Sequence, residues 1–371
     1  MKLLIPGPVT THAEVRAALA HDFAPWDGDF YPIYAGIRER LLPIAGVSTD
    51  THASLPLQGS GHFIVEAAIR SFVPRGGKIL VPMTGGYAAR LARLARTCGR
   101  EVVGLPVDAS ERTDPRAVAS VLAMDPAIGH LAFVYSETST GVVHDAVALS
   151  TAARVAGRRV IIDAVSAFGA LPLDLAAMPE VDAVLFTANK CLEAMPGLAF
   201  AIAPKARLIG RAEAAESWCL DLADIYEHAE HFGAGSFRFT PPAQVLNALL
   251  VALEIFAAEG GAVARLARYR ANLRALYDGV QAIGLTPYLP LPLQGPIVMN
   301  VLAPDDPRWD LLSFVELLKQ RGFLISNFYD TPLPSFRVGL IGALGAEDYR
   351  AAVAAMDDAL GALGIRKRKA A

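Results

Sequence analysis

Two residues with complementary chemistry follow apolar segments of the chain. Asp163 ends the run RVIID, and Lys190 stands just after the run AVLFTA. Short apolar runs of this kind predict buried strands, and ligands of an open α/β sheet bind beyond the carboxyl ends of its strands. A lysine amine can condense there with an aldehyde, and a carboxylate can hold a proton on a ring nitrogen. Taken singly, Asp163 could equally be a helix cap and Lys190 a solvated side chain.

A glycine-rich turn in LPLQGSGHFIVEAA predicts an anion site. Gly59, Ser60 and Gly61 lead directly into a helix that we expect to start near His62. Backbone N–H groups at a helix start, with the helix dipole behind them, bind phosphate. An ordinary turn with a serine cap explains the same residues about as well.

Tyr87 opens another predicted helix close after a strand, where its ring could stack on a flat cofactor or simply fill the core. The lysine, the acid and the phosphate loop together match the needs of pyridoxal 5'-phosphate (PLP). The ring of this cofactor acts as an electron sink when its nitrogen stays protonated. The sequence therefore predicts a PLP enzyme in which Lys190 forms the Schiff base.

The segments that must position these residues alternate between helix and strand patterns. Helical spacing over 63–73 and 87–99 is interleaved with apolar strands at 78–82 and 101–107. Repeated units of this size predict a mostly parallel sheet with helices on both faces. From about residue 243 long helices follow, closed at Gly260 and Gly284, and then short strands and a last helix. We therefore expect an α/β fold with an N-terminal arm (1–20), a large domain (21–260) and a smaller C-terminal α+β domain (261–371).

Composition narrows the class of protein. Hydrophobic residues make up 53% of the chain, charged residues 19%, and the net charge is -3, which argues against a nucleic-acid partner. No signal peptide or membrane helix is expected, because no long apolar run occurs. Three cysteines without CxxC spacing predict no disulfide framework and no metal site, and favour the cytoplasm. The basic tail at 366–371 is expected to be a solvated terminus.

A set of motifs resembles the class V aminotransferases in order and spacing. The motifs are PGPVTT (6–11), LQGSG (57–61), SETSTG (136–141), DAVSAFG (163–169), ANKCLEAMPG (188–197), FRFTPP (237–242) and FRVGLIG (336–342). They are most similar to the branch that transfers the amino group of 2-aminoethylphosphonate to pyruvate, giving phosphonoacetaldehyde and alanine. The resemblance implies PLP fold type I and a homodimer with active sites shared between subunits. It also implies a small-molecule amino donor and a keto-acid acceptor.

The resemblance assigns a role to each matching position. It makes Lys190 the Schiff-base lysine that takes and returns a proton, and Asp163 the partner of the pyridine nitrogen. Arg337 matches the arginine that grips the acidic end of the substrate, for which a planar fork of donors is suited. The implied cofactor-binding positions are Ser60, Gly61 and His62 in the phosphate loop, Thr187 and Asn189 beside it, Tyr87 stacked on the ring, Thr138 near the phenolic oxygen, and Thr240 delivered from the partner subunit.

Two positions depart from the phosphonate branch. His62 stands where that branch usually has Thr or Ser, and Tyr329 stands where it usually has Lys. The missing cation matters because a phosphonate carries up to two negative charges. An alanine/serine–glyoxylate type of aminotransferase, or a transaminase of another aminophosphonate, is therefore the alternative within the family. A PLP-dependent elimination lyase is the alternative from another reaction class, since it would share the lysine base.

Overall fold

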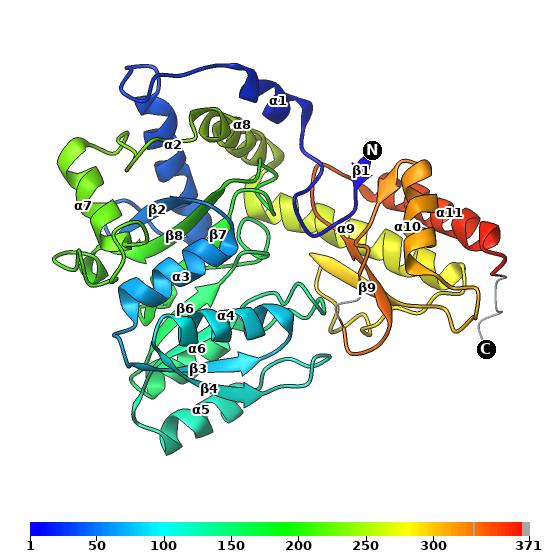
Figure 1. Cartoon of the computed structure of the whole chain (residues 1–371), viewed down its shortest axis with the longest axis horizontal. Coiled ribbons are helices and arrows are strands. Elements are labelled where there is room, and N and C mark those ends of the chain that lie inside the picture. Colours follow the sequence, from blue (N-terminus) through cyan, green and yellow to red (C-terminus); the bar gives the residue numbers. More distant parts are fainter. Residues whose placement is uncertain (329–330, 366–371) are drawn as a thin grey trace.

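A seven-stranded sheet forms the centre of the computed structural model, which describes residues 1–328 and 331–365 (Figure 1). All neighbouring strands pair in parallel except at β8, which is antiparallel to both of its neighbours. The expected mostly parallel sheet is thus confirmed. The predictions for Tyr329 and for the tail at 366–371 lie outside the described residues. The strand order is β2 (His52–Gln58), β8 (Leu198–Pro204), β7 (Val181–Thr187), β6 (Arg159–Asp163), β5 (Ile128–Val134), β3 (Lys78–Met83) and β4 (Glu101–Pro106).

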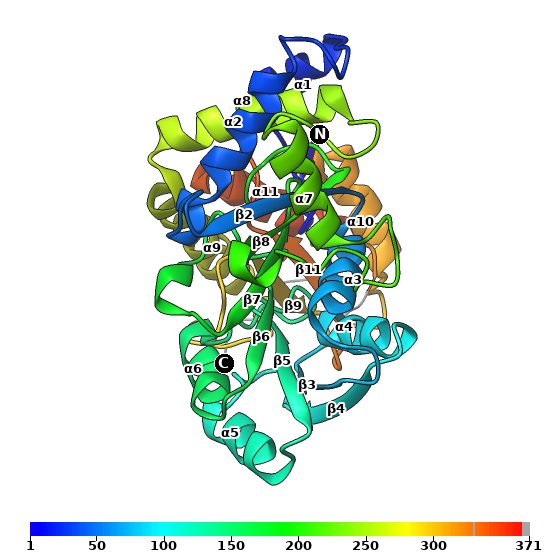
Figure 2. The ribbon, with the colours of Figure 1, turned by 90° about the vertical axis from the view of Figure 1, so that its left-hand side faces the viewer.

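Helices cover both faces of this sheet, as the alternating pattern predicts (Figure 2). Successive strand residues point to opposite faces, so Leu131 and Phe133 of β5 enter one core while Ala132 and Val134 enter the other. One face is covered by α3 (Gly61–Phe72), α4 (Gly86–Thr97) and α7 (Leu222–Phe232), and the other by α2 (Tyr31–Leu41), α5 (Pro115–Met124), α6 (Ala146–Val155) and α8 (Ala243–Glu259).

A third core belongs to the C-terminal part of the chain. There β9 (Val298–Leu302) pairs antiparallel with β11 (Ser335–Gly339), and α10 (Leu311–Gln320) and α11 (Ala346–Ala362) pack against them. The long helix α9 (Gly261–Ala282) joins the two parts, because its Leu266 lies in the large core and its Leu276 in the small one.

The N-terminal segment runs across both parts (Figure 1). Its strand β1 (Lys2–Leu3) pairs with β10 (Phe323–Leu324), and Leu4 is buried in the small core. Further along come α1 (Ala13–Ala17) and η1 (Ala18–Ala20). We keep the division into an arm (1–20), a large domain (21–260) and a small domain (261–371) as a proposal. The remaining short helices are η2 (Pro43–Ala45), η3 (Leu175–Ala177) and η4 (Lys205–Arg207).

No single helix in the described part of the chain is long and apolar enough to span a membrane. Only α8 and α9 taken together reach that length and composition, and a bend of 80° separates them.

Candidate active site

A cavity of about 160 Å³ lies where β6 and β7 end and where α3 and α4 begin. The alternation of helix and strand brings these four ends to the same edge of the sheet. Most of the positions predicted from sequence line this cavity, together with Val65, Arg90, Leu91, Leu94 and Val165. The predicted positions that line it are Ser60, Gly61, His62, Tyr87, Asp163, Thr187, Asn189 and Lys190.

Asp163 supplies the carboxylate of the cavity. It is the last residue of β6 and is only 7% exposed. Its Oδ1 accepts one hydrogen bond, from the Val165 backbone N–H at 3.0 Å. Burial raises the pKa of Asp163 to about 6, although the Val165 N–H and the charge of Lys190 act in the opposite direction. Such a carboxylate is suited to a ligand that brings its own cationic N–H group.

Lys190 supplies the amine. It lies in the turn that follows β7 and is 8% exposed. Burial, together with the positive charge of Arg337, lowers the pKa of Lys190 to about 8. Near that pH a large share of the side chain is the neutral amine, which is the form that attacks a carbonyl or accepts a proton.

The backbone of Gly7 lies directly against the Lys190 side chain. A Cβ atom at Gly7 would stand 2.7 Å from Lys190 Cδ and 2.9 Å from Cε. Its φ of +141° also lies in a region that other residues rarely adopt. Only glycine therefore lets the N-terminal segment come so close to the amine.

The start of α3 is open toward the cavity. Some helices have an aspartate side chain that caps the first turn, as Asp114 does for α5 and Asp221 for α7, but Ser60 makes no such bond at α3. Thr187 Oγ1, also on the cavity wall, is buried and has no hydrogen-bond partner within the described residues. Uncapped N–H groups and an unsatisfied hydroxyl together fit the oxygens of a phosphate.

The start of α4 is held from outside the helix. Glu137, fully buried in the loop after β5, accepts hydrogen bonds from the backbone N–H groups of Tyr87 and Ala88, each at 3.2 Å. Its carboxylate also accepts from Ser139 Oγ at 2.5 Å. These bonds fix the position of Tyr87 on the cavity wall, where the Arg90 guanidinium lies 4.7 Å from the centre of its ring.

Three predicted residues lie away from the cavity lining. Thr138 is buried and shares a 2.6 Å hydrogen bond with Ser166. Arg337, on β11, donates from Nη1 to the carbonyl oxygen of Thr138 at 3.0 Å, so the C-terminal part of the chain contacts the edge of the site. Thr240 lies near Gln58 in a separate groove of the surface.

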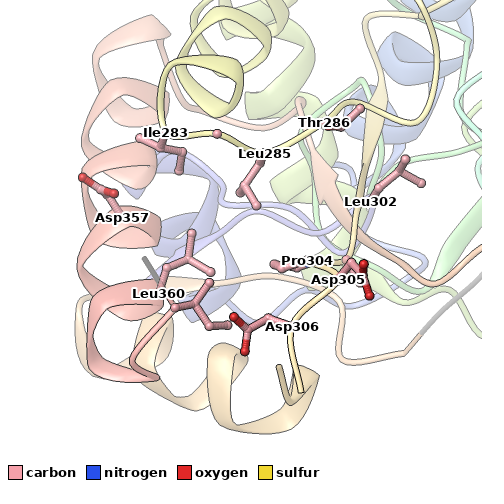
Figure 3. Close-up of a pocket in the computed structure, with 12 residues that line it drawn as sticks. Ile283, Leu285, Thr286, Leu302, Pro304, Asp305, Asp306, Asp357 and Leu360 are labelled. Atoms are coloured by element: carbon pink, nitrogen blue, oxygen red, sulfur yellow. The ribbon is translucent and has the colours of Figure 1, made fainter. Parts of the chain in front are cut away.

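A second hollow lies in the C-terminal part of the chain, between the end of α9, β9 and α11 (Figure 3). Apolar side chains such as Leu285 and Leu360 line it, with Asp305 and Asp357 at its rim. Its lining, as far as the chain is described, includes none of the residues that the sequence singles out for chemistry.

Sequence reasoning missed Gly7 and Glu137 as parts of the site. Both stand inside motifs that carry the family resemblance, PGPVTT and SETSTG. Glu137 stands three residues after Val134, the end of β5, so the rule about carboxyl ends of strands could have found it. Nothing in the local pattern reveals that Gly7 reaches Lys190, which lies far away in the sequence.

Comparisons with known proteins agree with this arrangement. The model of the family described as aminotransferase class-V matches residues 32–293. A protein of Burkholderia ambifaria named 2-aminoethylphosphonate–pyruvate transaminase is 41% identical over 99% of this chain and 97% of its own length. One of the same name from Pseudomonas putida is 41% identical over 96% of both chains.

Solved structures agree as well. Pyridoxamine–pyruvate aminotransferase of Mesorhizobium loti has a TM-score of 0.87 at 25% identity and covers 98% of this chain and 93% of its own. Ureidoglycine–glyoxylate aminotransferase of Bacillus subtilis has a TM-score of 0.87 at 23% identity, with 99% and 94% covered, and supports the fold alone. The expected fold and kind of enzyme are confirmed. The chain belongs to the class-V aminotransferase family.

Proposed function

We propose that this enzyme uses PLP to move the amino group of 2-aminoethylphosphonate to pyruvate, giving phosphonoacetaldehyde and alanine. The observation that carries the proposal is the end-to-end likeness to relatives named for this reaction, 41% identical over 96% or more of the chain. The likeness to solved aminotransferases with other names is lower, at 23–25% identity.

The cavity suits PLP in two respects. The uncapped start of α3 and the unsatisfied Thr187 hydroxyl are matched to its phosphate, for which Ser60, Gly61, His62 and Asn189 are the further contacts that we propose. Asp163 would hold the protonated ring nitrogen, Tyr87 would stack on the ring, and Thr138 would lie near the phenolic oxygen.

Each residue of the site has a distinct role in the proposed reaction. Bound PLP supplies an aldehyde for amine capture and a cationic ring that withdraws electrons from the reacting carbon. Lys190 Nζ accepts the proton from the substrate carbon that carries nitrogen, which its lowered pKa favours. Asp163 stays ionised beside a cationic N–H, and Arg337 pairs with the acidic end of the substrate. Gly7 lets the N-terminal segment cover Lys190 closely and limit access of water.

We also infer a homodimer in which the partner subunit's Thr240 reaches the cofactor phosphate. An exposed aromatic patch supports this inference: Phe63 is 52% exposed, Phe239 47% and Trp218 70%, and Phe63 and Phe239 line the same groove as Thr240. Exposed apolar patches of this kind mark contact surfaces between proteins. The cytoplasm remains the expected location.

A comparison of amino donors that differ in their acidic group tests the substrate. PLP-loaded enzyme receives 2-aminoethylphosphonate, 2-aminoethylsulfonate or β-alanine singly, without keto acid, and the absorbance change to the aminated cofactor is followed. We expect rapid conversion by the phosphonate alone, and recovery of the starting spectrum with pyruvate faster than with glyoxylate. Serine and alanine are tested in the same way, and faster conversion by either would favour the glyoxylate type. Ammonia release without an aminated cofactor would reveal a lyase. Lys190→Ala protein should show no conversion.

A further inference from the structure

A buried carboxylate lies in the same turn as Lys190. Glu193 is 1% exposed and has a positive φ of 57°. Of the non-glycine residues with positive φ in the described chain, Glu213, Glu216 and Phe239 are exposed and Glu193 alone is buried. This conformation is energetically costly for a residue with a Cβ. In the buried turn the contacts of Glu193 offset that cost.

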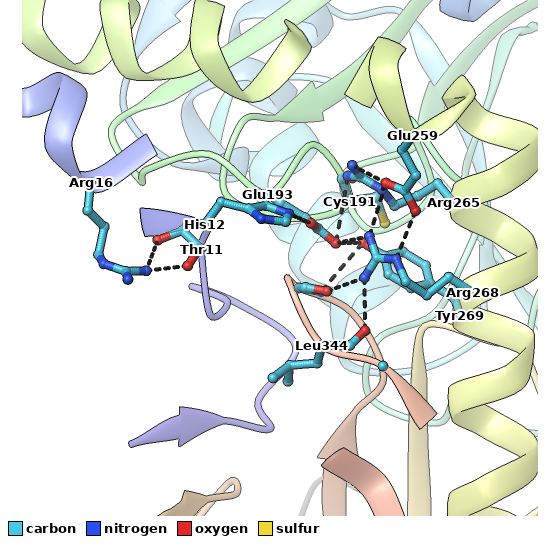
Figure 4. A network of polar contacts seen from close by, with 12 residues as sticks. Thr11, His12, Arg16, Cys191, Glu193, Glu259, Arg265, Arg268, Tyr269 and Leu344 are labelled. Atoms are coloured by element: carbon cyan, nitrogen blue, oxygen red, sulfur yellow. Dashed lines mark hydrogen bonds and ion pairs between the residues drawn. The ribbon is translucent and has the colours of Figure 1, made fainter. Parts of the chain in front are cut away.

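The side chain of Glu193 is held by the helix that joins the two domains (Figure 4). Its Oε1 accepts hydrogen bonds from Tyr269 Oη at 2.6 Å and Arg268 Nη2 at 2.9 Å, both on α9. His12 of the N-terminal segment lies 3.5 Å from Oε2. Burial would raise the pKa of Glu193, but His12, Arg265 and Arg268 outweigh it and lower that pKa. The side chain is thus a carboxylate.

The same helix holds the lysine loop, residues 188–197, at a second point. Arg265 Nη1 donates to the carbonyl oxygen of Cys191, the residue after Lys190, at 2.6 Å. Glu259, at the end of α8, pairs with Arg265 at 2.7 Å and with Arg268 at 2.8 Å. Glu259 therefore holds both arginine side chains in the positions from which they contact the loop.

Arg268 also contacts the small domain. Its Nη1 donates to the carbonyl oxygens of Gly342 at 2.6 Å and Leu344 at 3.0 Å. These residues follow β11, the strand that carries Arg337. Bidentate and charge-assisted bonds of this kind fix geometry as well as adding energy. The Arg268 side chain thus bonds both to Glu193 of the lysine loop and to the segment that follows β11.

We propose that Glu193 is a positioning residue that fixes the lysine loop to α9 and to the segment after β11, and so sets the spacing between Lys190 and Arg337. Within the loop, the Glu193 N–H donates to the Lys190 carbonyl oxygen at 2.9 Å, so a shift of Glu193 moves Lys190 directly. The inference rests on the proposed function only in taking Lys190 as the cofactor-binding lysine.

Three variants test the proposal against a matched control. Glu193→Ala and Arg268→Met remove the two sides of the bond, and Glu193→Gln keeps an acceptor for Tyr269 and Arg268 without the charge. Asp182→Asn removes another buried carboxylate bonded to arginines, at the opposite end of β7. We expect kcat per cofactor-loaded site to fall about 10- to 100-fold in Glu193→Ala and Arg268→Met, the scale of a small misplacement of catalytic groups. Glu193→Gln should restore most of it, and Asp182→Asn should leave it within twofold.

Two readouts do not depend on any substrate. The pH midpoint of the visible absorbance of bound cofactor should shift in Glu193→Ala and stay in place in Asp182→Asn. In cofactor-free protein, hydrogen exchange should speed up in peptides covering both 188–197 and 340–345 when either Glu193 or Arg268 is replaced. The double variant should lose no more kcat than the worse single variant, because residues that act as a unit are not additive.

The opposite results would overturn the proposal. If Glu193→Ala lowers only the unfolding temperature, with kcat per loaded site and the absorbance midpoint as in the wild type, the role is structural. Additive losses in the double variant, or faster exchange confined to the lysine loop, would show that the loop is not linked to the small domain. Failure of 2-aminoethylphosphonate as a donor would leave the spectral and exchange results unchanged, so the two proposals fail separately.

Discussion

Asp182 and Asp163 stand at opposite ends of neighbouring parallel strands, and their surroundings differ. Asp182, near the start of β7, is fully buried and bonds to Arg159 at 2.6 Å, Arg207 at 2.7 Å and His130 at 3.2 Å. Asp163, at the end of β6, accepts one hydrogen bond from a backbone N–H and faces the cavity. The two carboxylates are similarly buried, but Asp182 has several charged hydrogen-bond partners and Asp163 has a single backbone one.

This difference appears in their acidity. Burial alone would raise both pKa values. At Asp182 the hydrogen bonds from His130, Arg159 and Arg207 outweigh burial and lower the pKa to about 2. At Asp163 burial prevails, and the pKa rises to about 6. Asp182 is fully bonded to cationic side chains of the fold, whereas Asp163, with one backbone hydrogen bond, can still accept a cationic N–H group of a ligand.

Asp163→Asn should have the largest effect on turnover. An amide cannot hold a proton on the ring nitrogen, so we expect kcat to fall about a thousandfold, the scale of losing one strong electrostatic stabiliser. In cofactor-free protein the same substitution should be favourable, because it should raise the free energy of unfolding. The folded pKa lies above the ordinary 3.8, so the ionised carboxylate costs stability as the pH rises from about 4 through 6. The variant should therefore be more stable than the wild type at pH 8, by about 2–3 kcal/mol.

Urea unfolding of the two cofactor-free proteins at pH 4 and pH 8 measures that difference, and stopped-flow turnover of the loaded enzymes measures kcat. Equal stability at both pH values would contradict the idea that Asp163 is under-satisfied. A kcat within tenfold of the wild type would remove Asp163 from the proposed chemistry.

The sequence was sufficient for much of the large domain because its signals are local. The strands at 78–83, 101–106, 128–134, 159–163 and 181–187 are short apolar runs between helical repeats, and Asp163 and Lys190 stand at their ends. We did not predict β2, β8 and α7. Since β2 pairs with β8, a strand about 140 residues away in the chain, no window of sequence contains the pair.

The missed parts of the site have the same cause. Glu193 stands in a motif that we quoted, yet its partners Arg265, Arg268 and Tyr269 lie on a helix more than 70 residues later. Nothing in the sequence indicates the positive φ of Glu193, because glutamate is not a residue typical of that conformation. Contacts between distant segments therefore required the structure, whereas the chemistry of single motifs did not.

Gly7→Ala should have an intermediate effect at the cavity end of the sheet. The new Cβ would stand 2.7 Å from Lys190 Cδ, so the side chain of Lys190 must move. A misplacement of about 1 Å costs about 10- to 100-fold in kcat. Gly233→Ala is the control, because Gly233 also has a positive φ (93°) but has nothing within 4 Å of an added Cβ. Both variants should lose stability through backbone strain, and only Gly7→Ala should lose kcat per loaded site. Equal kcat in the two variants would mean that Lys190 can move aside without effect.

Asp182→Asn should have the smallest effect on turnover and a clear effect on stability. Since the folded pKa of about 2 lies below the ordinary 3.8, the carboxylate contributes stability that is complete above pH 4 and is lost as the pH falls through 2. The variant should be less stable by about 2 kcal/mol at pH 7, and this deficit should shrink steadily below pH 4. Urea unfolding of cofactor-free protein between pH 3 and pH 7 measures it, with kcat per loaded site as the parallel readout. A tenfold loss of kcat would contradict the contrast drawn between Asp182 and Asp163. It would show that a fully bonded carboxylate near the start of β7 influences the chemistry at Lys190, beyond the end of that strand.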